Sequence, residues 1–214
     1  MQILSKISKF CQKYLFLLIF SLTGCQQSKS DNQALKALPQ DSFIQVYFNH
    51  SQTSEYQEPY RSRIRKGDNL EQNIIDGISQ ANSTIDVAVQ ELSLPLVAQA
   101  LVKKHQAGVE VRIILENNYS RAWSDFTGPQ LNKLAQRERL KYQEFKKFVD
   151  TNEDGKLSEE EINQRDAVKI IGNAEIPLID DTADGSKGSG LMHHKYIVID
   201  NRFVIVTSAN FTLS

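Results

Sequence analysis

Apolar residues recur along this chain with two periods, one typical of strands and one typical of helices. Residues 84–89 (TIDVAV) and residues 109–115 (VEVRIIL) are short, apolar and rich in β-branched side chains, which predicts two buried strands. Residues 94–105 between them have the spacing of an amphipathic helix, which Gly108 ends. A strand, a helix and a strand in this order predict a right-handed crossover between parallel strands.

The same periods predict further elements on both sides of this unit. Residues 43–48 (FIQVYF) alternate well enough to predict a strand. Residues 69–80 carry apolar side chains at helical spacing, with Asp68 as the expected N-cap. Residues 191–207 contain two more strands, separated by a turn at residues 200–202. The sequence therefore predicts an α/β protein with a mixed β-sheet flanked by helices.

The start of the chain predicts an exported protein. Three lysines precede an apolar core at residues 14–22, which is too short to span a bilayer comfortably. The segment ends in small residues before Cys25 and resembles the signal peptide of bacterial lipoproteins, in which this cysteine is diacylated. An ordinary secretory signal or a membrane anchor is the alternative. In the lipoprotein interpretation, residues 1–24 are removed, Cys11 is lost with them, and residues 25–41 tether a domain to the cell envelope.

The remaining part of the chain is acidic. The first 25 positions hold three of the 25 basic residues and none of the 26 acidic ones, so 22 basic and 26 acidic residues remain, a formal charge of −4. The 190 residues from Cys25 onward suffice for one domain with a core. Proteins that bind nucleic acid by broad electrostatic attraction are usually strongly basic. The charge thus argues against broad electrostatic binding of nucleic acid, although a small basic cleft in an acidic protein is compatible with such a ligand.

The most informative motif is the run HHKYIVID, which spells H-x-K-x-x-x-x-D with His193, Lys195 and Asp200 at its fixed positions. On a strand, side chains two residues apart share a face, so His193 and Lys195 are expected together and His194 on the opposite face. An imidazole that attacks or protonates, beside an ammonium that holds an anion, suits phosphate chemistry.

This run resembles the H-x-K-D signature of the phospholipase D superfamily. The resemblance includes a box similar to G-S-x-N that follows the run, here residues 207–210 (TSAN) with Ser208 and Asn210. Residues 83–120 also look like the N-terminal half-domain of that superfamily. A phospholipase D-like half-domain over residues 42–214 is therefore the expected fold.

The resemblance also implies roles for individual residues. His193 is expected to form a phosphohistidine or to protonate the leaving group. Lys195 is expected to bind the non-bridging oxygens, and Ser208 and Asn210 to line the phosphate site. Asp200 is expected to orient the site from the turn. The chemistry implied by the family requires no metal.

One segment, residues 131–165, interrupts the expected half-domain. Its residues 150–161 (DTNEDGKLSEEE) fit D-x-[DN]-x-[DN]-G-x5-E at every position, and both flanks have helical composition. The segment resembles an EF-hand, with Gly155 at the sharp turn. The expected Ca²⁺ ligands are Asp150, Asn152, Asp154, the carbonyl of Lys156, Ser158 and Glu161. A single loop binds more weakly than a pair, and the role expected of it is structural or regulatory. An acidic helix–turn–helix that binds no metal is the alternative.

The mechanism of the family needs two histidines, one that attacks and one that protonates, and this chain has one H-x-K motif. His50 and His105 are the other histidines, and neither has a lysine two residues later. A second motif is expected either from a homodimer partner or from a missing C-terminal half. Three functions remain open at this point: a lipid-anchored phosphodiesterase acting on phospholipid headgroups, an envelope nuclease acting on DNA or RNA, and an inactive calcium-binding surface lipoprotein.

Overall fold

The computed structural model describes residues 35–185 and 190–213, which form two units divided after Gln40. Residues 35–40 are exposed and contain no helix or strand. The expected signal peptide, Cys25 and residues 25–34 of the expected tether lie outside the described residues. Within the described ranges, no helix has the length and apolar character needed to cross a bilayer.

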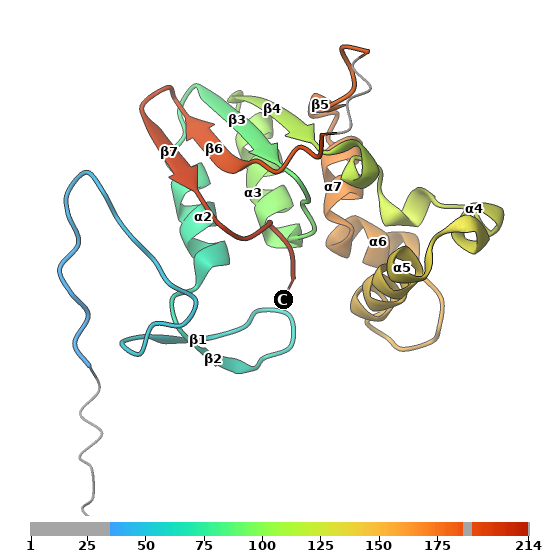
Figure 1. The fold of residues 1–214 in the computed structure, drawn as a ribbon, viewed down its shortest axis with the longest axis horizontal. Coiled ribbons are helices and arrows are strands. Elements are labelled where there is room, and N and C mark those ends of the chain that lie inside the picture. The colour runs from blue at the N-terminus through green and yellow to red at the C-terminus, as the bar shows by residue number, and fades with distance from the viewer. Residues whose placement is uncertain (1–34, 186–189, 214) are drawn as a thin grey trace, which may run out of the picture. The chain divides into compact units, whose positions relative to one another are not determined.

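A five-stranded sheet with the strand order β5-β4-β3-β6-β7 forms the centre of the second unit (Figure 1). Neighbours β3, β4 and β5 are parallel, whereas β6 runs antiparallel to β3 and β7 antiparallel to β6. The predicted α/β class, the mixed sheet and the parallel crossover are confirmed. The strands are β3 (Thr84–Val89), β4 (Glu110–Leu115), β5 (Leu178–Asp180), β6 (Lys195–Ile199) and β7 (Phe203–Val206).

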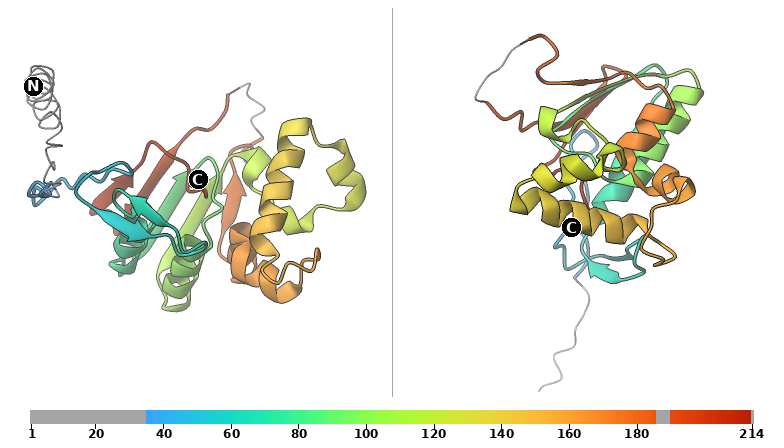
Figure 2. Two further views of the ribbon diagram at one scale, coloured as in Figure 1. Left: turned by 90° about the horizontal axis from the view of Figure 1, so that it is seen from below. Right: turned by 90° about the vertical axis from the view of Figure 1, so that its right-hand side faces the viewer.

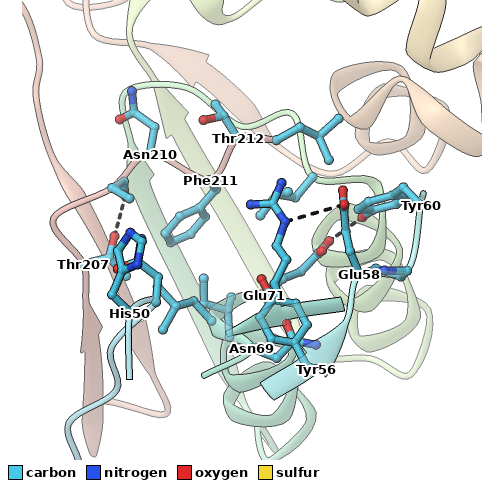
Figure 3. Close-up of a pocket in the computed structure, with 18 of the residues that line it drawn as sticks. His50, Tyr56, Glu58, Tyr60, Asn69, Glu71, Thr207, Asn210, Phe211 and Thr212 are labelled. Atoms are coloured by element: carbon cyan, nitrogen blue, oxygen red, sulfur yellow. Dashed lines mark hydrogen bonds and ion pairs between the residues drawn. The ribbon is translucent and has the colours of Figure 1, made fainter. Parts of the chain in front are cut away.

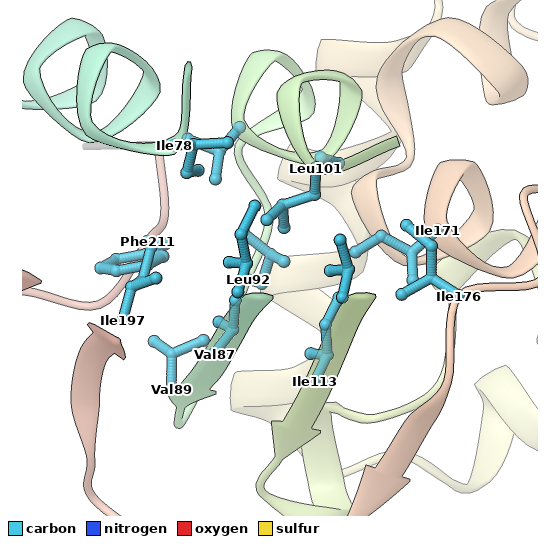
Figure 4. Packing of buried hydrophobic residues seen from close by; sticks show 14 of the residues in the cluster. Ile78, Val87, Val89, Leu92, Leu101, Ile113, Ile171, Ile176, Ile197 and Phe211 are labelled. Atoms are coloured by element: carbon cyan, nitrogen blue, oxygen red, sulfur yellow. The ribbon is translucent and has the colours of Figure 1, made fainter. Parts of the chain in front are cut away.

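Three helices pack on one face of this sheet, namely α2 (Leu70–Ser79), α3 (Pro95–Gln106) and α7 (Ala167–Asn173) (Figure 4). Alternate side chains of the strands, such as Val87 and Ile197, are buried against them. The opposite face of the sheet carries polar side chains, among them Asp86 and Arg112, which form an ion pair (2.6 Å). This alternation of buried and polar side chains is the period-two pattern that predicted the strands.

The segment between β4 and β5 is longer than the sequence analysis predicted. It begins with two short 3₁₀ turns and a short helix, so the inserted segment starts well before residue 131, where the sequence had placed its beginning. Figure 2 shows these elements gathered beyond the β5 edge of the sheet. The elements are η1 (Asn117–Tyr119), η2 (Trp123–Asp125), α4 (Gly128–Lys133), α5 (Gln136–Val149) and α6 (Glu159–Arg165). The helices predicted on either side of residues 150–158 are present as α5 and α6.

The predicted strand at residues 43–48 is wrong. These residues are irregular and exposed, with 94% of Phe43 accessible. The carboxylate of Asp41 accepts hydrogen bonds from the N–H groups of Phe43 and Ile44, which turns the chain at that point. A pattern of alternating residues becomes a strand only where another strand edge pairs with it. The structure instead has a small antiparallel hairpin, β1 (Glu55–Gln57) and β2 (Ile64–Lys66), which the sequence analysis missed.

The N-cap predicted for α2 is also wrong by one residue. Asn69, rather than Asp68, caps the helix, with its side-chain oxygen accepting from the N–H of Gln72 (3.1 Å). Asp68 instead accepts from the N–H of Phe48 and from the hydroxyl of Ser54. Its carboxylate thus holds the irregular segment before the helix.

Candidate active site

The cationic residue of the H-x-K motif is the first residue of β6. Lys195 lies opposite Val89 at the end of β3, and its side chain points to the helix-covered face, where it is only 8% exposed. Its ammonium donates to the carbonyl of His193 (3.0 Å). None of the ion pairs between described side chains includes Lys195. A buried ammonium without a carboxylate is suited to an anionic ligand.

The histidines of the motif lie just outside the strand. His193 is exposed and lies two residues before the first residue of β6, with His194 between them. His194 packs edge-on against Tyr196, with ring centroids 5.7 Å apart, and its carbonyl accepts from the N–H of Gln90. Tyr196 alternates with the buried Lys195 along β6. The imidazole of His194 is therefore on the face opposite to Lys195, as the sequence predicted.

Asn210 is joined to the end of β3 through a residue that the sequence analysis missed. Its amide nitrogen donates to the side-chain oxygen of Gln90 (3.2 Å), and its amide oxygen is buried with no hydrogen-bond partner among the described residues. Gln90 is itself 7% exposed. No motif signals a glutamine at this position, because its role depends on the meeting of β3 with the segment after β7. A buried acceptor without a hydrogen-bond partner indicates a place where a polar ligand can bind.

The segment after β7 brings Asn210 to the same edge as Lys195. The N–H of Thr207 donates to the carbonyl of Lys195, and the hydroxyl of Thr207 donates to the carbonyl of Ala209 (2.6 Å). Ser208, which the sequence also assigns to the phosphate site, is exposed in this turn. Four motif residues therefore lie at the same end of neighbouring strands, where β3 and β7 end and β6 begins, hereafter the sheet edge. They are His193, Lys195, Ser208 and Asn210.

Asp200 lies at the opposite end of β6 from this group. Its carboxylate accepts hydrogen bonds from the N–H groups of Asn82, Ser83 and Thr84, and these bonds hold its pKa well below the usual range. Asp200 and Asn201 both have positive φ, as a tight type I′ hairpin turn requires. The contacts of Asp200 therefore fasten the β6–β7 hairpin to the start of β3, and the structure does not bring it to His193.

A cavity of about 390 Å³ lies beside the gathered residues and is lined by Asn210, Thr207 and Ala209 (Figure 3). The β1–β2 hairpin and the start of α2 form its other wall. Glu58 and Glu71 line this wall, and burial raises the pKa of Glu71, which the hydrogen bond from Tyr60 partly offsets. Neither His193 nor Lys195 is among the residues that line the cavity.

The two other histidines are separated by the fold. His50 lines the cavity, on the side of Thr207 (Figure 3). His105 lies in the last turn of α3, with a buried Nδ1 atom that has no hydrogen-bond partner among the described residues. No sequence motif marks the position of His50, and the strand predicted just before it is absent, so its place beside Thr207 depends on the tertiary fold.

The loop between α5 and α6 has its side-chain oxygens turned toward its own backbone. Asp150 accepts from the N–H groups of Asp154 and Gly155, and Asn152 also accepts from Asp154. Gly155 has a φ of +77°, the left-handed conformation that the sharp turn needs. Asp154 accepts in turn from the N–H of Lys156 (2.8 Å).

Glu161 closes this loop from the other side. It accepts from the N–H and hydroxyl of Ser158 with one oxygen, and from Thr151 and the N–H of Asn152 with the other. These hydrogen bonds, those of Ser158 foremost, lower the pKa of Glu161 to about 2. It is therefore a carboxylate at any physiological pH.

The chemistry of the donor set fits Ca²⁺, which prefers six to eight oxygen ligands. In the described residues, however, no three acidic, histidine or cysteine side chains are gathered closely enough to hold a metal ion. The two carboxylate oxygens of Glu161 are bonded instead to Ser158 and to residues 151–152. A bound cation needs Glu161 to exchange these bonds for the metal.

Residues 74–214 match the family described as cardiolipin synthase, PLD-like domain. Among solved structures, Nuc from Salmonella typhimurium, a phospholipase D family member, is similar with 22% sequence identity and a TM-score of 0.39. The match covers 66% of this chain and 64% of the Nuc chain, which is less than two thirds of the latter.

NucT from Helicobacter pylori is similar with 17% sequence identity and a TM-score of 0.37, over 74% of each chain. No curated protein sequence matches the chain.

Proposed function

The chain belongs to the phospholipase D superfamily, whose members are phosphodiesterases, and on this premise we propose that it hydrolyses phosphodiester bonds of phospholipid headgroups. The observation that carries the proposal is the buried ammonium of Lys195, which has a carbonyl and no carboxylate among its described partners. A phosphodiester supplies the negative charge that this position lacks. The family description, which is named for an enzyme of phospholipid synthesis, supports a lipid as the substrate class.

In the proposed mechanism, His193 attacks phosphorus and forms a P–N bond while the bond to the headgroup oxygen breaks. Lys195 holds a non-bridging oxygen, and the amide of Asn210, which Gln90 orients, lines the same site. A second histidine protonates the leaving oxygen and then takes a proton from the water that cleaves the P–N bond. We propose that it comes from a second H-x-K motif, supplied by a homodimer partner or by a further half of a longer chain.

We also propose that the protein is lipid-anchored through Cys25 in a bacterial cell envelope, where phospholipid is concentrated. The proposed cofactor is Ca²⁺, held by Asp150, Asn152, Asp154, the Lys156 carbonyl, Ser158 and Glu161. Its charge would order the loop, and the phosphodiester chemistry would not pass through it.

The experiment that tests the function uses phosphatidylcholine vesicles, cardiolipin vesicles and single-stranded DNA as parallel substrates. We expect headgroup release from lipid and, after rapid acid-free quenching, a phosphatidyl adduct on His193 by mass spectrometry. Cleavage of DNA with untouched lipid would establish the nuclease alternative. Calcium binding without turnover of any substrate would leave a surface lipoprotein with an inactive half-domain.

A further inference from the structure

Helix α5 connects the loop at residues 150–161 directly to the body of the domain. The helix ends at Val149, and its C-cap is Asp150, the first expected ligand of the loop. Phe148 and Val149 are both buried, so the last turn of α5 is held by the domain while its next residue belongs to the loop. A change at the start of the loop is therefore transmitted to a packed helix end.

The first contact of α5 with the rest of the domain is the pair of Phe148 and Tyr60. Their rings meet edge-to-face with centroids 5.2 Å apart and an angle of 80°. Arg165, at the end of α6, lies over the Phe148 ring and donates to the Phe148 carbonyl (2.9 Å). Both helices that flank the loop therefore position the ring that touches Tyr60.

Tyr60 carries this contact to the wall of the cavity. Its hydroxyl donates to the carboxylate of Glu71 and accepts from the N–H of Leu96 at the start of α3 (3.3 Å). Tyr60 and Glu71 both line the cavity, together with Asn210 (Figure 3). Phe148 thus contacts the tyrosine whose part-buried hydrogen bond to Glu71 lies in the cavity wall.

A second contact leads from α5 to the edge of the sheet where the motif residues gather. Lys141, two turns before Phe148, forms an ion pair with Glu91 (3.0 Å). Glu91 follows Gln90, the partner of Asn210, and its carbonyl accepts from the N–H of Phe211. The helix therefore touches both the cavity wall and the segment that positions Asn210.

Glu161 is the group through which a cation can act on these contacts. In the described structure its carboxylate ties residues 151–152, next to the end of α5, to Ser158 at the start of α6. A divalent cation that takes both carboxylate oxygens removes this tie and replaces it with bonds to the metal. The relative placement of the two helix ends then changes, and Phe148 and Arg165 change with it.

From these contacts we infer that a divalent cation in the loop controls the candidate active site through α5, by way of Phe148–Tyr60 at the cavity and Lys141–Glu91 at the sheet edge. The inference rests on the proposed calcium site. It assigns the inserted helices a regulatory role toward Asn210 and the cavity, and it assigns Phe148 and Lys141 the role of positioning residues.

The test is amide hydrogen exchange of the full chain with millimolar Ca²⁺ and without divalent cations. We expect calcium to change exchange by about threefold or more in peptides covering residues 58–74 and residues 88–93. A peptide covering residues 196–206 serves as the reference. Phe148→Leu should abolish the change at residues 58–74, and Lys141→Met the change at residues 88–93. Calcium affinity from calorimetry should stay within about twofold in both variants.

Lys147→Met and Phe145→Leu, on the same helix, are the matched controls and should retain both changes. Calcium binding that leaves both peptides unchanged would overturn the inference, as would changes that persist in Phe148→Leu and Lys141→Met. Absence of calcium binding would overturn both the inference and the calcium site, while leaving the phosphodiesterase proposal intact. If the exchange changes occur in a protein without phosphodiesterase activity, the coupling stands and the proposed activity fails.

Discussion

The edge of the sheet that carries His193 and the loop at residues 150–161 are both marked by short sequence motifs, but they are built differently. At the sheet edge, Lys195 is buried on a scaffold of strands and is bonded to a carbonyl. In the loop, the carboxylates are bonded to backbone N–H groups within the same twelve residues.

The difference shows how a charged side chain is stabilised in each place. The loop satisfies its own charges by hydrogen bonds within residues 150–161. At the sheet edge, the buried ammonium of Lys195 is bonded to a carbonyl but to no carboxylate, and the amide oxygen of Asn210 is buried without a hydrogen-bond partner among the described residues. Unsatisfied polar groups of this kind are expected where a ligand binds.

The largest effect should come from removal of the attacking imidazole at the sheet edge. We predict that His193→Ala lowers phosphodiesterase turnover by about 10³-fold or more, because the route through the P–N bond is lost. His194→Ala should retain a measurable fraction, since its side chain packs on Tyr196 on the opposite face. Initial rates on phospholipid vesicles measure both, and equal losses would contradict the assignment of faces.

Replacement of the buried cation should separate activity from stability. Lys195→Met is expected to lower turnover by about 10²-fold or more, because a group that stabilises charge on phosphate is removed. The free energy of unfolding in urea should stay within about 1 kcal/mol of the parent or rise, since an unpaired buried charge is removed. Lys103→Met, at an exposed position of α3, is the control for both measurements. A marked loss of stability in Lys195→Met would mean that the hydrogen bond from the ammonium to the His193 carbonyl holds the fold together.

In the loop, substitution should affect calcium and spare the chemistry. We expect Glu161→Gln to weaken calcium binding by about tenfold or more, because a bidentate carboxylate ligand is lost. Turnover at saturating substrate and saturating calcium should remain near that of the parent. Isothermal calorimetry measures the calcium affinity, and steady-state kinetics measures the turnover. Lost turnover in a folded, calcium-saturated variant would place the metal in the mechanism.

The smallest effect is expected from protonation of the Glu161 carboxylate in the loop. The pKa of Glu161 is about 2 in the folded chain, below its usual 4.5, because hydrogen bonds from Ser158 and Thr151 favour the carboxylate. Since the folded pKa is depressed, this stabilisation is complete above about pH 4.5 and is lost as the pH falls toward 2. A carbon-13 NMR titration of the calcium-free protein should find this midpoint, and a midpoint near 4.5 would show that the bonds do not persist in solution.

Patterns within a single element predicted most of the fold. Residues 84–89 and 94–105 have strong periods and flanking breakers, and the structure contains β3 and α3 there. Residues 43–48 have a similar alternation but are not a strand, because the structure gives them no strand edge to pair with. The hairpin at residues 55–66 escaped prediction because its strands have three residues each.

The candidate site was predicted in part for the same reason. His193, Lys195 and Asn210 were found because their spacing is fixed along the chain. Gln90 and His50 were not, because each reaches the site from an element distant in sequence. Asp200 is in the motif by sequence but lies at the far end of β6, since five residues of extended strand separate it from the histidine.

By itself, the sequence determined the α/β class, the loop at residues 150–161 and the motif residues, because each depends on local period, turn chemistry or fixed spacing. Only the tertiary structure decided that Lys195 is buried without a carboxylate, that Gln90 orients Asn210, and that α5 touches both Tyr60 and Glu91. These features arise where separate elements pack together. Burial and partner choice are properties of that packing, and no pattern along a single segment encodes them.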